Sequence, residues 1–108
     1  MARVHNRYLV LSVYPPEYLG RVLGRLNEVF KQLAGKDALG VNVRVYDTYP
    51  GKGFAVLGVP RNLVNVLRAS TCIVRDVDGA RVMVLTVKVT GTLRRARAIA
   101  QSINLMGL

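Results

Sequence analysis

Hydrophobic positions recur at helical spacing between residues 19 and 33. Apolar side chains return every three or four residues, while charged side chains such as Arg21 and Arg25 take the opposite side. The prolines at 15–16 supply a start signal and Gly35 supplies a stop signal. The pattern therefore predicts an amphipathic helix over this segment.

Other segments have the patterns of β-strands. Residues 7–14 are nearly all apolar, which is typical of a central strand buried on both faces. Residues 41–47 alternate strictly, which places Val41, Val43 and Val45 inside and the residues between them outside. The remaining strand-like segments are 54–59, 73–77 and 81–89, separated by turns or short helical segments.

Two further helices complete the order of elements. A short helix is predicted from Pro60 to about Ser70, and the last helix from about Thr92 to Met106. The order is β-α-β-β-α-β, with the final β element doubled into a hairpin and one helix appended. We therefore predict an α+β fold of the ferredoxin-like class, an RNA-recognition-motif-like α/β sandwich with an antiparallel sheet and an appended C-terminal helix. At 108 residues, the chain (1–108) is predicted to be a single domain.

The chain is strongly basic, with 16 Lys and Arg against 6 Asp and Glu and a net charge of +10. Most of the basic residues are arginine, whose planar guanidinium contacts a phosphate through two hydrogen bonds. The excess positive charge is concentrated in residues 49–108. These features favour a polyanion, RNA or DNA, as the ligand, and they place the binding residues mainly in the second half of the chain.

Three arginines stand near the predicted start of the last helix, where positive charge is unfavourable. Each cation there costs on the order of 0.3–1 kcal/mol unless an anion is bound. Gly91 allows a tight turn, and Thr92 or Thr90 can cap the helix. The free backbone amides together with Arg94, Arg95 and Arg97 therefore predict a phosphate site. The alternative interpretation is an amphipathic helix whose polar face is basic. It explains the spacing of apolar and basic residues along the helix, but not the crowding of cations at its start. The secondary phosphate ligands are expected to be Lys52, Arg61, Arg75 and Lys88.

The segment 52–59, Lys-Gly-Phe-Ala-Val-Leu-Gly-Val, partly matches the octapeptide of RNA-recognition motifs. Its first four positions fit, but valines stand at the remaining aromatic positions, so few rings are left for base stacking. We expect its outward-facing residues to lie under the appended helix or to meet a protein partner. The residues predicted for partner contact are Tyr8, Tyr46, Tyr49, Phe54 and Val56.

The sequence offers no catalytic constellation. His5 is the only histidine, Cys72 is the only cysteine, and no carboxylates cluster at metal-ligand spacing. A small phosphatase that holds its substrate with arginine is the one enzymatic alternative. No apolar run approaches the ~18 residues of a membrane span, and the N-terminus lacks the apolar segment of a secretory signal. We therefore expect a cytoplasmic protein without a membrane partner.

Several short motifs resemble one known family. They are Arg-Tyr-Leu-Val at 7–10, the glycine-containing turn at 49–53, Arg61 after the following strand, and above all Val-Thr-Gly-Thr-Leu-Arg at 89–94. In these positions the chain is similar to protein component 2 of ribonuclease P from archaea and eukaryotes. The similarity extends from the first strand to the last helix.

This resemblance implies an RNA-binding subunit of ribonuclease P, the ribonucleoprotein that removes the 5′ leader from precursor tRNA. It also implies a partner, protein component 3, in a heterotetramer with two copies of each protein. In that family setting the RNA performs the cleavage with Mg²⁺, so the protein needs no cofactor of its own and is no enzyme by itself. Precursor tRNA is then an indirect partner. A general single-stranded-RNA binder of the recognition-motif type remains the alternative.

Overall fold

The computed structural model describes residues 6–105, so His5 and Met106 lie outside the described residues. Its regular elements follow the predicted order: β1 (Asn6–Tyr14), α1 (Leu19–Ala34), β2 (Arg44–Tyr49), β3 (Phe54–Pro60), α2 (Val64–Ile73), β4 (Asp76–Val77), β5 (Ala80–Arg81), β6 (Met83–Thr90) and α3 (Leu93–Leu105). Short 3-10 turns flank two of the helices: η1 (Pro16–Tyr18), η2 (Gly35–Ala38) and η3 (Arg61–Leu63).

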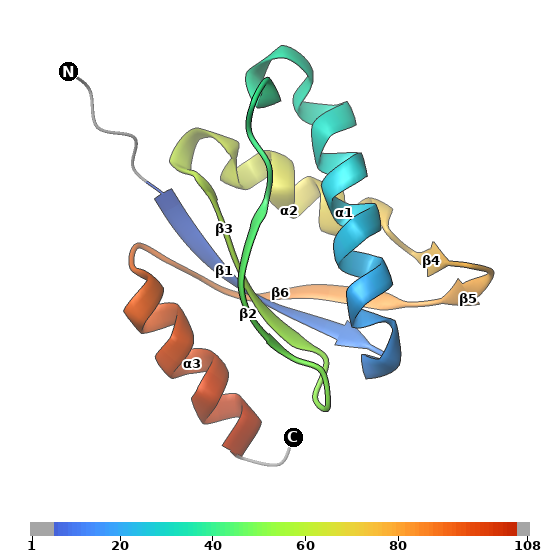
Figure 1. Cartoon of the computed structure of the whole chain (residues 1–108), viewed down its shortest axis with the longest axis vertical. Helices are drawn as coiled ribbons and strands as arrows, with labels where there is room; N and C mark the ends of the chain where they lie inside the picture. The colour runs from blue at the N-terminus through green and yellow to red at the C-terminus, as the bar shows by residue number, and fades with distance from the viewer. Residues whose placement is uncertain (1–5, 106–108) are drawn as a thin grey trace.

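Four strands form one antiparallel sheet in the order β2-β3-β1-β6 (Figure 1). β1 lies inside the sheet because it is apolar on both faces, and Leu9, Val10 and Leu11 are all fully buried. β4 and β5 pair separately as a small ribbon. The predicted α+β, ferredoxin-like class is therefore confirmed, with the appended helix as α3.

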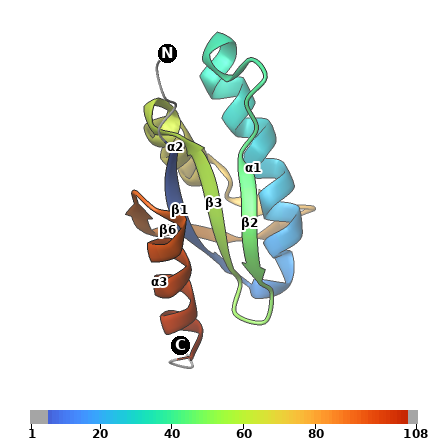
Figure 2. The same ribbon diagram turned by 60° about the vertical axis from the view of Figure 1, so that its left-hand side comes forward.

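Helices cover both faces of the sheet, α1 and α2 on one side and α3 on the other (Figure 2). The larger core lies under α1 and α2, because the apolar stripe predicted for residues 19–33 faces the sheet. Its largest fully buried side chains are Leu9, Leu11, Leu26, Phe30, Leu57 and Leu67. This core joins α1 and α2 to β1, β3 and β6, whereas no side chain of β2 takes part in it.

A second, smaller core lies between the sheet and α3. Val10 and Val56 come from the sheet, and Ala96 and Ala100 come from the helix; all four are fully buried. The two alanines allow the α3 backbone to approach the strands closely. Tyr8, Tyr46, Tyr49, Leu93 and Ile99 pack around this centre and are partly buried.

The strand predicted over 41–47 starts later than expected in the structure, and its pairing with the next strand is irregular. β2 begins at Arg44, and its register with β3 shifts between Val45 and Asp47. The strict alternation therefore fails at the shift, and Val45, predicted to be inside, is 47% exposed. Val41 and Val43 do pack against the larger core, although they precede the strand.

The second hairpin also differs from its prediction. α2 continues to Ile73 instead of ending near Ser70, so Ile73 is the last residue of a helix and is half exposed. The last turn is closed by the Val74 amide, which donates to the Ser70 carbonyl at 3.3 Å, and the Ser70 hydroxyl donates to the Val66 carbonyl at 2.8 Å within the helix. The paired arms are then reduced to β4 and β5, and β6 starts anew at Met83.

Gly53 has a structural role that explains part of the octapeptide match. Its φ is +73°, and a side chain there would collide with the carbonyl oxygen of Val13. Its own carbonyl accepts a 2.8 Å hydrogen bond from the Val13 amide. The β2–β3 turn thus closes against the end of β1, and this position requires glycine for the fold itself.

Candidate nucleic-acid interface

The first turn of α3 has the capped geometry that the sequence predicted. The Arg95 amide donates to the Thr92 hydroxyl at 3.2 Å, which makes Thr92 the cap, and the Thr90 hydroxyl donates to the Thr92 carbonyl at 2.8 Å. Helix geometry leaves the amides of Leu93 and Arg94 without intrahelical acceptors. The side chains of Arg94 and Arg95 are exposed beside these amides. Positive charge and free donors therefore meet at one place.

A further arginine joins this place from β1. The Arg7 side chain lies next to Gly91, with Nη1 3.6 Å from where a Cβ atom on that glycine would stand. The contact arises because β1 and β6 are paired, with Tyr8 opposite Thr90. Sequence reasoning did not assign Arg7 to the site, since more than eighty residues separate it from Gly91 and only strand pairing joins them. We refer to the Leu93 and Arg94 amides with Arg7, Arg94 and Arg95 as the α3 anion site.

Arg97 is placed differently from the other two helix arginines. Its Nε donates to Asp47 Oδ2 at 2.7 Å and its Nη2 donates to Oδ1 at 3.3 Å, so helix α3 is tied to strand β2. The hydrogen bond to Asp47 raises the pKa of the Arg97 guanidinium above its ordinary value, and the charge is retained. A phosphate contact by Arg97 stays a prediction, and it requires this ion pair to open.

The four secondary cations do not lie together on the protein. Arg61 directly follows β3, whose last residue pairs with Asn6 at the same end as the α3 anion site. Lys52 precedes the other end of β3, roughly 20 Å away at the usual rise per strand residue. Arg75 lies beyond α2, where its Nε donates to the Cys72 carbonyl at 3.4 Å. Lys88 is exposed on β6. One continuous site for all four is therefore not formed.

The sheet face predicted for partner contact is covered by α3. Val56 is fully buried and Phe54 is only 7% exposed, so neither side chain is open to a partner or to an RNA base. Tyr8, Tyr46 and Tyr49 border the small core under the helix. The open stacking platform needed by the recognition-motif alternative is thus occupied by the protein's own helix. Partner contact by these residues stays a prediction, for which α3 would have to move.

An exposed apolar strip lies beside the covered area, on the same face of the sheet. It consists of Tyr14, Met83, Leu85 and Val87, whose exposed fractions range from 41% to 69%. Tyr14 pairs with Met83 across β1 and β6, and β6 is an edge strand. We call this set the β6 strip. Exposed basic residues lie beside it: Arg75 and Arg81 line one pocket with Tyr14 and Met83, and Lys88 follows Val87 on β6.

Sequence reasoning did not separate the β6 strip from the core. In the segment 81–89, apolar residues occupy both odd-numbered and even-numbered positions, which is the pattern of a strand buried on both faces. In the structure only one face is covered, because Val84 packs under α2 while Leu85 stays open. The position of β6 at the sheet edge accounts for the difference.

Within residues 6–105, no helix has both the length and the apolar character to cross a membrane. Among the same residues, no three His, Cys, Asp or Glu side chains gather into a group that would hold a metal ion.

A family model described as the Rpp14/Pop5 family, of ribonuclease P proteins, matches residues 7–101. The match covers most of α3 and, except for Asn6, the whole sheet. The chain belongs to the Rpp14/Pop5 family. The resemblance to a ribonuclease P protein component, read from motifs such as residues 89–94, is thereby confirmed. Comparison with curated proteins gave no significant match.

The Rpp14/Pop5 assignment agrees with a likeness among solved structures. One chain in a cryo-EM structure of yeast ribonuclease MRP superposes with a TM-score of 0.63. The superposition covers 99% of this chain and 94% of the yeast chain at 15% sequence identity. At this identity the likeness shows that the two chains share a fold. This Rpp14/Pop5 protein therefore has the architecture of a chain that occurs in a ribonucleoprotein structure.

Proposed function

We propose that this protein binds the catalytic RNA of ribonuclease P and supports removal of the 5′ leader from precursor tRNA. The observation that carries the proposal is the α3 anion site, where Arg7, Arg94 and Arg95 converge on a capped helix start. An RNA phosphate there supplies the negative charge that the helix end and its cations require. Membership of the Rpp14/Pop5 family supports RNA of this ribonucleoprotein as the source of that phosphate.

The protein's part is electrostatic and geometric in this proposal. The RNA and Mg²⁺ perform the cleavage, and the protein neutralises phosphates so that folded RNA segments can approach each other. Arg94 and Arg95 lie on a helix whose start is capped by Thr92, so the backbone that carries them is already ordered before a phosphate binds. Contacts of this kind position an RNA strand without reading its sequence.

We further propose protein component 3 as the partner that covers the β6 strip, within a cytoplasmic complex of two copies of each protein. The strip combines apolar side chains with an unpaired strand edge, and both features favour a protein surface. Its rim is basic, so a complementary partner surface carries acidic groups around an apolar centre. A second copy of this chain presents the same basic rim, which disfavours direct strip-to-strip contact.

The RNA proposal is tested by the salt dependence of binding to ribonuclease P RNA. In the Arg94→Gln/Arg95→Gln variant we expect weaker binding, and a slope of log K against log salt that is shallower by about 1.5, since each phosphate contact contributes roughly 0.7–0.9. Arg7→Gln should reduce the slope by about half as much. Filter binding between about 50 and 200 mM salt measures both.

The matched control replaces two basic residues on the far side of the sheet. Arg25→Gln/Lys31→Gln removes the same charge from α1, and its slope should stay close to that of the unchanged protein. If the helix variant and the α1 variant weaken binding equally, net charge alone accounts for the affinity. The α3 anion site would then be rejected as the RNA contact. Reconstituted cleavage of precursor tRNA at low Mg²⁺ gives the functional readout.

A further inference from the structure

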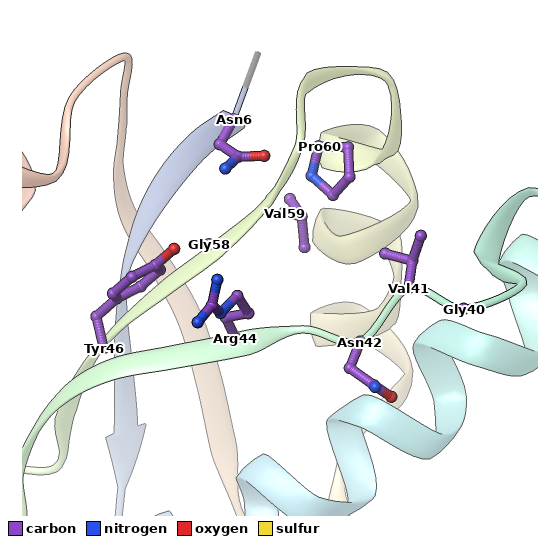
Figure 3. Close-up of a pocket in the computed structure, with 9 residues that line it drawn as sticks. All are labelled: Asn6, Gly40, Val41, Asn42, Arg44, Tyr46, Gly58, Val59 and Pro60. Atoms are coloured by element: carbon purple, nitrogen blue, oxygen red, sulfur yellow. The ribbon is translucent and has the colours of Figure 1, made fainter. Parts of the chain in front are cut away.

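A pocket of about 390 Å³ opens at the end of the sheet where β1 begins and β3 ends (Figure 3). It lies between these strands, the start of β2 and the segment before it. The lining residues are Asn6, Gly40, Val41, Asn42, Arg44, Tyr46, Gly58, Val59 and Pro60. Its volume falls within the range of small-molecule sites, which is roughly 300–1,000 Å³.

The polar groups of this pocket are donors and neutral acceptors. Figure 3 shows the Asn6 amide and the Arg44 guanidinium directed toward the space, whereas the Asn42 side chain points away. None of the lining residues is Asp or Glu, so no fixed negative charge opposes an anionic ligand. Val41 and Pro60 give the pocket apolar walls, whereas the Val59 side chain is buried in the larger core. A flat apolar ligand with polar edges and a negative charge fits this combination.

The Tyr46 ring is held in a fixed position beside the opening. It lies against Gly58, where a Cβ atom would come within 2.5 Å of the ring carbon Cε2. Its edge meets Tyr8 with ring centroids 5.6 Å apart at 66°. The Arg44 guanidinium carbon lies 5.6 Å from the Tyr46 ring centre, so the ring in turn supports Arg44. A supported guanidinium offers a planar surface for a nucleic-acid base.

The pocket and the α3 anion site lie at the same level of the sheet. Arg44 pairs with Gly58, Gly58 with Tyr8, and Tyr8 with Thr90, which lies three residues before Leu93 of the α3 anion site. Three strand spacings separate the outer members of this row, or roughly 14 Å. A single RNA strand spans such a distance within a few nucleotides. The two places can therefore be occupied by one strand.

We propose that this pocket binds one unpaired nucleotide of an RNA whose backbone contacts the α3 anion site. The base stacks on the Arg44 guanidinium against Pro60, and the Asn6 amide bonds to the base edge. An unpaired nucleotide is required, because bases within a duplex expose neither face for stacking. This inference rests on the proposed RNA-binding function and adds to it a preference for single-stranded over duplex segments.

The test compares two probes by fluorescence anisotropy: single-stranded oligoribonucleotides of about ten residues, and a perfect RNA duplex of similar length. In the Asn6→Ala/Arg44→Gln variant we expect about tenfold weaker binding of the single strand, since stacking of one base contributes on the order of this factor. Duplex binding should change less than twofold. Arg68→Gln, which removes an exposed charge from α2, is the matched control and should leave the ratio of the two affinities unchanged.

A second variant separates stacking from charge. Arg44→Lys keeps the positive charge and loses the planar surface, so single-strand binding should fall almost as far as with glutamine. Full affinity in Arg44→Lys, or equal loss for both probes in the double variant, would overturn the nucleotide pocket. Loss of component 3 binding without loss of RNA binding would assign the pocket to a protein instead.

The outcomes also separate this inference from the proposed function. If the unchanged protein binds ribonuclease P RNA with a salt slope that depends on Arg94 and Arg95, the proposed function stands whatever the pocket variants show. If it binds no RNA, both proposals fail together. Thermal unfolding of each variant establishes that a lost affinity does not come from a lost fold.

Discussion

The two faces of the sheet are packed in different ways. Under α1 and α2, large side chains such as Leu26, Phe30 and Leu57 fill a continuous core. Under α3, the helix contributes two alanines to the buried centre, and tyrosines with polar tips surround it. Apolar burial scales with the area removed from water, so most of the stabilisation comes from the first face. The second face is then free to carry arginines, an open apolar strip and the pocket.

The difference in packing between the two faces can be seen at two adjacent positions of β3, Leu57 and Val56. Leu57 faces the larger core and Val56 faces α3, and both are fully buried. Complete burial therefore does not mean an equal contribution to the fold. What differs is the number and size of the side chains that surround each residue.

The largest effect is expected for Leu57→Ala. The substitution leaves a cavity between the sheet and two helices, and should lower the free energy of unfolding by about 2–5 kcal/mol. Val56→Ala, on the opposite face, should cost clearly less, because it removes two side-chain carbons instead of three and leaves its cavity in a smaller cluster. Urea unfolding of both variants measures the difference. Equal losses would show that the α3 face stabilises the protein as much as the other face does.

An intermediate effect is expected for Leu85→Ser in the β6 strip. Leu85 is 54% exposed, so the free protein should keep its stability. Binding to protein component 3 should weaken at least tenfold, since burial of a leucine side chain contributes about 1.5–3 kcal/mol. Isothermal titration measures the affinity, and Leu39→Ser, at an exposed leucine before β2, serves as the control. Unchanged affinity in Leu85→Ser would exclude the strip as the partner surface.

The smallest effect is expected for Thr92→Ala at the start of α3. Loss of the hydroxyl that accepts from the Arg95 amide should cost about 1 kcal/mol, while Thr92→Ser should retain most of the cap. Because α3 rests on the smaller core, the loss should appear as faster hydrogen exchange of α3 amides, with α1 unaffected. Equal acceleration in both helices would mean that α3 does not open separately from the larger core.

Periodicity was sufficient for the elements with one strong pattern. The amphipathic repeat over 19–33 predicted α1, and the all-apolar segment 7–14 predicted a central strand. The capped start of α3 was also readable, because Thr92 and the arginines beside it are neighbours in sequence. Local order of this kind depends on residues within a few positions of each other. The predicted fold class follows from the order of such elements.

The candidate site could be predicted only in part, because some of its contacts join residues that are far apart in sequence. Arg94 and Arg95 were predicted, but Arg7 reaches the site through strand pairing, and Arg97 is directed to Asp47 on a strand fifty residues away. The exposure of Val45 depends on a register shift between β2 and β3. Such contacts are decided by the relative positions of strands, which no single segment encodes.

The charge and periodicity of the sequence were thus sufficient to predict three properties: a basic protein, two helices packed against an antiparallel sheet, and an arginine-rich last helix. Only the tertiary structure decided which apolar residues that helix covers and which remain open on β6. It also placed Asn6, Arg44 and Tyr46 around one pocket. The physical reason is that hydrophobic burial fixes which face of a strand is apolar, whereas strand order and helix docking fix what covers that face.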